Sequence, residues 1–274
     1  SLGFSLSSHV SHGSRHVQNG SCRMSTRAFT ITLAASIVLA ATAARAQTVA
    51  DTNAAAPYGV SPVDDQRLYV HGLLDQFEAR LGGENSFRWD GQAWAGTDTN
   101  RLWLKSEGFV NGNGKVEDGT HELLYSRPIS TYFDLQGGLR YDIDSGPSRG
   151  WAAFGIQGLA PQFFDVEATA YVSDSGHFAA RAKASYDILL TQRLILQPEA
   201  ELNLYSKADP GRGVGSGFAD LDAGLRLRYE ISRKFAPYIG VAYQQKFGGT
   251  ATFARQEGES VRDVRFVFGI RSWF

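Results

Sequence analysis

The fold is decided by one stretch of the chain, Asp263-Val264-Arg265-Phe266-Val267-Phe268-Gly269-Ile270-Arg271-Ser272-Trp273-Phe274. Every second residue counted back from Phe274 is apolar except Ser272, whereas the positions between them include Arg265 and Arg271. An alternation with a period of two residues predicts a β-strand with one apolar face and one charged face. Such a strand fits either a soluble sheet or a transmembrane β-barrel, in which the apolar face meets lipid and the polar face meets the lumen.

The overall composition fits a chain of many strands joined by tight turns. Among 274 residues there are 30 glycines and only 8 prolines, and the formal net charge is −1. The mean hydropathy is slightly negative, which argues against a helical membrane protein but not against a barrel with a polar lumen. A charge near zero gives no reason to expect a nucleic-acid partner. The single cysteine, Cys22, has no partner in the chain for a disulfide.

The first 66 residues are predicted to precede the folded domain. Residues 1–23 lack periodicity and are interpreted as a disordered upstream extension, with Met24 as the start of the protein. Residues 24–46 have a basic start, an apolar run and the small-residue pattern Ala44-Arg45-Ala46, which together indicate a signal peptide. The apolar run is too short to span a bilayer comfortably, because about 20 residues are needed. Residues 47–66 are expected to form a flexible periplasmic lead-in.

From residue 67 to residue 274 the chain alternates in segments separated by clusters of Gly, Asn, Asp, Ser and Pro. About twelve strands are predicted, and none of the chain shows sustained helical periodicity. Their expected bounds are 67–80, 86–95, 101–110, 115–126, 130–142, 150–160, 162–173, 177–189, 192–205, 217–230, 235–247 and 262–274. An even number of strands is typical of bacterial outer-membrane barrels. The expected fold is therefore an all-β, antiparallel, up-and-down transmembrane barrel of about twelve strands.

The lengths of the connections favour the barrel over a soluble sheet. Counted from the first strand, the two longest connections, 206–216 and 248–261, both fall in the odd-numbered class. Even-numbered connections such as 190–191 and 231–234 are short. In an outer-membrane barrel alternate connections lie on the same side of the membrane, and the external ones are longer than the periplasmic ones. A soluble β-sandwich imposes no such alternation of loop lengths.

Five of the later strands allow their two faces to be assigned, whereas the first four alternate less cleanly. The expected lumen-facing side chains are mostly charged: Asp165, Glu167, Arg181, Lys183, Asp187, Gln197, Glu199, Glu201, Asp220, Asp222, Arg226, Arg228, Glu230, Gln244 and Lys246. Since unpaired charges in a narrow lumen are costly, networks of ion pairs are expected there. Pro198 removes a donor from its strand, so a bulge is expected at that residue.

No pattern in the chain predicts an enzyme. After the signal peptide the histidines are His71, His121 and His177, and no Gly-x-Ser-x-Gly motif surrounds them. Carboxylate pairs such as Glu199 and Glu201 follow automatically from a charged lumen face, so they do not indicate a glycosidase. The glycine-rich segment 211–217 lacks the Lys and the following helix of a phosphate loop, and is interpreted as an external loop.

Across residues 67–274 the sequence resembles the copper resistance protein B family of bacterial outer-membrane proteins. The matching stretches occur in the family's order: 89–94 (WDGQAW), 100–108 (NRLWLKSEG), 124–127 (LYSR), 157–161 (QGLAP), 163–169 (FFDVEAT), 190–198 (LTQRLILQP), 221–230 (LDAGLRLRYE) and 235–240 (FAPYIG). The resemblance implies an outer-membrane barrel of copper homeostasis that binds or passes copper ions, beside a periplasmic multicopper oxidase. Its partners would be membrane lipid and copper, and it would have no catalytic site.

The resemblance leaves the metal ligands open. Family members commonly carry a Met- and His-rich segment before the barrel, but residues 47–66 contain neither residue type. The weak metal candidates are therefore barrel residues, namely His71, His121, Glu107, Glu199 and Glu201, since imidazole suits copper. The alternative function is a small general porin or structural barrel without metal specificity.

Overall fold

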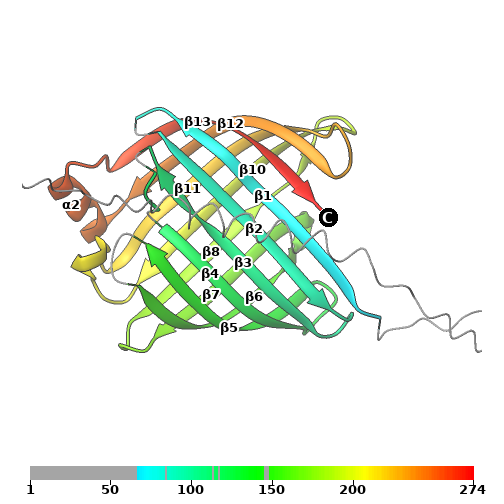
Figure 1. Ribbon diagram of the computed structural model, residues 1–274, viewed down its shortest axis with the longest axis horizontal. Helices are drawn as coiled ribbons and strands as arrows, with labels where there is room; N and C mark the ends of the chain where they lie inside the picture. Colours follow the sequence, from blue (N-terminus) through cyan, green and yellow to red (C-terminus); the bar gives the residue numbers. More distant parts are fainter. Residues whose placement is uncertain (1–66, 84, 113, 117, 145–147) are drawn as a thin grey trace, which may run out of the picture. The chain divides into compact units, whose positions relative to one another are not determined.

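The computed structural model describes residues 67–83, 85–112, 114–116, 118–144 and 148–274, and its strands form one antiparallel sheet (Figure 1). The expected upstream extension, signal peptide and lead-in lie outside the described residues. The strands are β1 Tyr69–Leu81, β2 Ser86–Gly96, β3 Arg101–Asn111, β4 Asp118–Pro128, β5 Phe133–Asp144, β6 Arg149–Ala160, β7 Phe164–Ser173, β8 Phe178–Ser185, β9 Ile188–Leu189, β10 Leu194–Tyr205, β11 Gly217–Tyr229, β12 Phe235–Lys246 and β13 Arg262–Trp273. When β8 and β9 are counted as one strand, the bounds lie within three residues of those predicted.

The sheet closes on itself. β13 pairs with β1, and β10 pairs with both β8 and β11, so the order of strands runs in a ring without an edge. The short strand β9 continues the line of β8 along β10, and the two count as one barrel strand. The fold is thus a closed antiparallel barrel of 12 strands, as predicted.

The two ends of the barrel differ. β1 begins and β13 ends at one end, which Figure 1 shows on the right with the carboxyl terminus. The long connections lie at the opposite end, where α2 (Gly248–Glu257) and η3 (Pro210–Arg212) are drawn side by side in Figure 1. Following the barrel rule, the end with the short turns is periplasmic and the end with α2 is extracellular.

Helical structure in the loops was missed by the sequence prediction. α2 is a ten-residue helix that packs against β11, and η2 (Pro161–Phe163) and η3 are single 3-10 turns. Half of α2, whose sequence is GGTATFARQE, consists of Gly, Thr and Phe, which do not favour helix, and the segment is too short to show a clear period. Among the described residues, no helix has the length and apolar character that crossing a membrane would require.

The wall of the barrel is apolar outside and polar inside. On β12, Ile239 is 64% exposed and the next lumen-facing residue, Tyr238, only 5%. On β11, Leu225 is 47% exposed and Arg226 only 2%. The faces predicted for the later strands are therefore confirmed, and the buried set of the described residues consists largely of charged and polar lumen side chains. This inverted pattern is that of a membrane barrel rather than a water-soluble domain.

The expected bulge at Pro198 is wrong. β10 pairs with β11 in unbroken register through Pro198, and the only shift along that pair lies between Asn203 and Leu204. On the other side of β10, pairing stops between β8 and β9 and then resumes in the same register. The missing donor of Pro198 is thus accommodated by an interruption of the neighbouring strand, not by an extra residue in its own.

Ser272, the polar residue on the apolar face of β13, lies at the periplasmic rim. Its hydroxyl donates a hydrogen bond to the Lys234 carbonyl oxygen at 2.9 Å, in the turn between β11 and β12. The neighbouring Trp273 donates its indole N–H to the Arg233 carbonyl oxygen at 2.5 Å. Ser272 is therefore satisfied at the interface, where a hydroxyl costs little.

Candidate functional site

A network of ion pairs fills the lumen between β1, β2, β10 and β11; we call it the ionic belt. It consists of Gln76, Glu78, Arg80, Arg88, Glu199, Glu201, Asp222 and Arg226. Members on the same strand are an even number of residues apart, so the pleat of each strand directs their side chains to the same, lumen-facing side.

The centre of the ionic belt is Glu78, whose side chain is fully buried. Its carboxylate accepts hydrogen bonds from Arg80 at 2.8 Å, from Arg226 at 2.9 and 3.0 Å, and from the Tyr238 hydroxyl at 3.0 Å. Arg226 also donates to Gln76 at 3.0 Å. Two guanidinium groups compensate the buried charge of this carboxylate, and its four hydrogen bonds fix its orientation.

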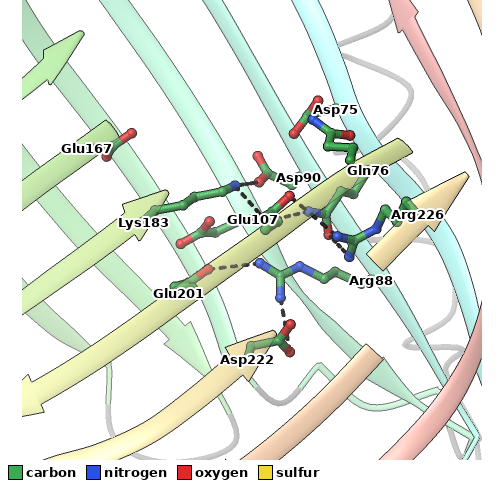
Figure 2. A network of polar contacts seen from close by, with 12 residues as sticks. Asp75, Gln76, Arg88, Asp90, Glu107, Glu167, Lys183, Glu201, Asp222 and Arg226 are labelled. Atoms are coloured by element: carbon green, nitrogen blue, oxygen red, sulfur yellow. Dashed lines mark hydrogen bonds and ion pairs between the residues drawn. The ribbon is translucent and has the colours of Figure 1, made fainter. Parts of the chain in front are cut away.

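The other half of the belt joins β2 to β10 and β11. Arg88 contacts Glu201 at 3.0 Å and Asp222 at 3.4 Å (Figure 2). Asp222 is shared with Arg80, whose guanidinium lies 2.6 Å away. Glu199 accepts from the Gln76 amide at 2.8 Å and lies 3.4 Å from Arg226.

Opposite walls of the barrel also meet through β8. Lys183 of β8 lies 2.6 Å from Asp90 of β2, and Figure 2 shows the two side chains extended toward one another. Arg181 of β8 pairs with Glu107 of β3, and Glu167 of β7 lies 2.8 Å from Lys105 of β3. Side chains from facing walls of the barrel therefore meet across the mid-lumen.

A cavity of about 250 Å³ lies in the periplasmic half of the lumen, next to the ionic belt. We call it the acidic cavity, because six carboxylates line it against four cationic side chains. The carboxylates are Asp75, Asp90, Glu107, Asp165, Glu167 and Asp187, and the cations are Lys105, Arg181, Lys183 and Arg271. The lining thus contains two more carboxylates than cations, and one of these carboxylates, Asp187, is paired with Arg228 from outside the lining.

The acidic cavity differs from the ionic belt in containing a carboxylate, Asp165, without a direct partner among the described residues. Asp165 forms no hydrogen bond or ion pair with any described residue, whereas Asp75 pairs with Arg271 at 2.6 Å and Asp187 with Arg228 at 2.8 Å. Asp165 is exposed at the periplasmic start of β7. The charged groups that act on Asp165 are Asp187, Arg271 and Asp75, none of which contacts it directly.

The three carboxylates proposed from the sequence as metal ligands are all already paired. Glu107 is held by Arg181, Glu199 by Gln76 and Arg226, and Glu201 by Arg88. Glu107 lines the acidic cavity, but the other two belong to the ionic belt. Among the described residues, no group of three or more His, Cys, Asp or Glu is arranged to hold a metal ion.

The two candidate histidines lie on opposite faces of the wall. His71 of β1 points into the lumen near its periplasmic end, where its ring lies 6.1 Å from that of Trp94 and 5.8 Å from that of Trp273. His121 of β4 faces outward, because it alternates with the buried lumen residues Thr120 and Glu122. The structure therefore does not bring His121 together with any of the lumen candidates.

At the extracellular end of the barrel, the connection 206–216 contacts residues of β5 and β6. Arg212 of this connection reaches the lumen residue Asp142 of β5 at 3.0 Å, and Asp209 lies 2.7 Å from Arg149 of β6. Asp142 is also bound by Arg140 at 2.6 Å. The glycine-rich sequence indicated an external loop, but nothing in it predicted that Arg212 would bind inside the barrel.

Solved structures similar to this chain include two porins. The KdgM porin has a TM-score of 0.45 at 12% identity, covering 75% of this chain and 99% of that protein. The NanC porin has a TM-score of 0.47 at 11% identity, covering 74% of this chain and 99% of that protein.

Relatives by sequence are far more similar. The copper resistance protein B of Escherichia coli is 46% identical over 213 residues, which is 77% of this chain and 72% of the relative. The homologue from Pseudomonas syringae pv. tomato is 45% identical over the same length. The family described as "Copper resistance protein B precursor (CopB)" matches residues 68–274, which includes every strand of the barrel, and the word precursor agrees with the predicted signal peptide. The chain therefore belongs to the copper resistance protein B family and is a copper-resistance barrel of the bacterial outer membrane.

Proposed function

We propose that the barrel binds copper ions in the acidic cavity and passes them across the outer membrane. The observation that carries the proposal is the excess of carboxylates around this cavity, with the unpaired Asp165 at its periplasmic mouth. Carboxylate oxygens and the imidazole of His71 are both ligands that divalent copper accepts. Copper as the particular cation is supported by the family, not by the geometry.

The ionic belt supports a gated passage rather than a general porin. Small hydrophilic solutes need a continuous water path, and the contact of Lys183 on β8 with Asp90 on β2 crosses the mid-lumen. A cation held at the belt could replace Arg or Lys as the partner of a carboxylate, and so move from one carboxylate to the next. This crossing contact favours a selective passage over the alternative of an unselective porin.

The proposed role is binding and passage, without a catalytic step. A periplasmic multicopper oxidase is the partner that the family resemblance suggests, and it would meet the barrel at the end with the short turns. Copper delivered by such a partner would enter the barrel from the periplasmic end. The acidic cavity lies in that half of the lumen, so the long extracellular loops would take no part in the delivery.

A growth experiment tests the function. Deletion of the gene is expected to lower tolerance of graded copper, while tolerance of zinc and of hydrophilic antibiotics stays unchanged. Complementation with the Asp165→Asn variant is expected to restore tolerance only partly. The matched control is Asp174→Asn, since Asp174 is exposed in the external turn after β7 and makes no contact with the cavity. Unchanged copper tolerance in the deletion strain would contradict the proposal.

A further inference from the structure

A second hollow lies at the extracellular rim, where α2 packs beside the ends of β12 and β13. Its volume is about 580 Å³. Three apolar residues, Phe247, Ala251 and Val261, and three cationic residues, Lys246, Arg255 and Arg262, line it. We call it the rim pocket; it lies outside the lumen site and has no part in the copper proposal.

The charge of the rim pocket is not balanced from within. Lys246 is paired with Glu259 at 2.6 Å, but Arg255 and Arg262 are exposed and form no ion pair with any described residue. α2 also begins at the pocket, with Gly248 in its lining, so the positive end of the helix dipole adds to the same potential. The uncompensated positive charge of the rim pocket therefore favours an anionic ligand.

The strand register places the rim pocket at the edge of the lipid-facing surface. Arg262 pairs with Gln245, and the next outward-facing pairs toward the membrane are Val264 with Tyr243 and Phe266 with Val241. Val264 is 58% exposed and Phe266 71% exposed on that face. An amphiphile could therefore lay its acyl chains on Val264 and Phe266 while its anionic group entered the pocket.

We propose that the rim pocket binds the phosphorylated headgroup of a glycolipid of the outer leaflet. Phosphate oxygens accept charge-assisted hydrogen bonds from Arg, and basic pockets beside a membrane surface recognise anionic headgroups. The apolar floor of Phe247, Ala251 and Val261 favours a lipid over free phosphate, since an inorganic anion gains nothing from apolar contact. This site would anchor the extracellular loops to the lipid around the barrel.

The test compares ligands on the unaltered barrel and on a variant. The purified barrel in neutral detergent is titrated with phosphorylated lipid A, with lipid A stripped of its phosphates, and with inorganic phosphate, and binding is followed by native mass spectrometry. Only the phosphorylated lipid is expected to bind. The double variant Arg255→Gln/Arg262→Gln is expected to bind it about tenfold or more weakly, because two charge-assisted contacts are lost.

The control variant is Arg127→Gln/Arg193→Gln. Both of these arginines are exposed at the periplasmic end, so the net charge changes equally while the rim pocket is untouched. This variant is expected to bind the phosphorylated lipid as the unaltered barrel does. Equal binding of the lipid without phosphates would overturn the proposal, and so would equal affinity of the double variant. Binding of inorganic phosphate as tight as that of the lipid would also overturn it, because the source would then not be a headgroup.

Discussion

Arg226 of β11 donates hydrogen bonds to both carboxylate oxygens of Glu78 on β1, across the two strands that separate them. Gly269 of β13 makes room for this contact. A Cβ at Gly269 would lie 2.7 Å from the Glu78 Cβ and 2.7 Å from the Tyr238 hydroxyl oxygen. The absence of a side chain at Gly269 is therefore one of the conditions that allow Arg226 to reach Glu78 in the ionic belt.

Removal of Arg226 is expected to destabilise the barrel. The Arg226→Met variant leaves the fully buried Glu78 with Arg80 as its only cationic hydrogen-bond partner, and breaking a buried pair costs about 3–5 kcal/mol. The measurement is the urea midpoint of reversible unfolding in lipid vesicles. Arg193→Met, in a periplasmic turn, is expected to keep the original midpoint, and adding Glu78→Gln to Arg226→Met is expected to recover part of the loss. A midpoint unchanged in Arg226→Met would show that the contact contributes nothing.

Removal of the two cations of β8 is expected to open the lumen. The variant Arg181→Ser/Lys183→Ser deletes the side chains that reach Glu107 on β3 and Asp90 on β2. Single-barrel conductance in planar bilayers is expected to rise severalfold, and the reversal potential in a salt gradient to shift toward cation selectivity, since carboxylates without partners remain. Arg127→Ser/Arg193→Ser serves as the charge-matched control. If both variants conduct like the unaltered barrel, the mid-lumen is not closed by these residues.

Loss of the contacts at the extracellular mouth is expected to free the connection 206–216. Arg149→Gln/Arg212→Gln removes two ion pairs of this connection, that of Arg212 with Asp142 and that of Arg149 with Asp209. Trypsin added to intact cells is then expected to cleave after Lys207 severalfold faster, since proteolysis follows the population of the open loop. The same assay on Arg127→Gln/Arg193→Gln gives the background rate, and a rate for the double variant no higher than this background would show that the ion pairs do not restrain the loop.

Of the two histidines, only His71 is expected to respond to copper. Its ring lies between Trp94 and Trp273 in the lumen, so a divalent copper ion bound there would quench their fluorescence. Quenching by copper is expected in the unaltered barrel and in His121→Gln, whose side chain faces outward, but to weaken strongly in His71→Gln. Equal quenching in all three proteins would place the copper elsewhere.

The strands and their faces could be predicted because the two-residue period is local. On β11, the alternation of Leu225 and Arg226 shows in the sequence which side chain meets lipid. The same period was hidden on β4, where Leu123, Leu124 and Tyr125 are consecutive, and this left the face of His121 unassigned. Its outward position follows only from the pairing of the folded sheet.

The partners inside the lumen could not be predicted, because they depend on how far the sheet is staggered on closing. Nothing local to Lys183 indicates Asp90 as its partner, 93 residues away. Nor does the sequence distinguish Glu199, held in the ionic belt, from Asp165, which is exposed and unpaired, since both are carboxylates on lumen-facing positions. The acidic cavity is thus a property of the closed ring.

The irregularity in β1 around Asp75 has a consequence for how this chain can change in length. Leu74 pairs with Gly91 and Gln76 with Asp90, so Asp75 is the extra residue of a β-bulge. The side chains of Asp75 and Gln76 both face the lumen. Deleting Asp75 would remove the bulge, because Leu74 and Gln76 would then follow one another in a regular strand, and His71 and Leu73 would keep facing the lumen. Deleting a regularly paired residue such as Ala79 would instead turn every β1 residue before it to the other face. A single-codon deletion at Asp75 is therefore expected to be far less damaging than one at Ala79, although both remove one residue from β1.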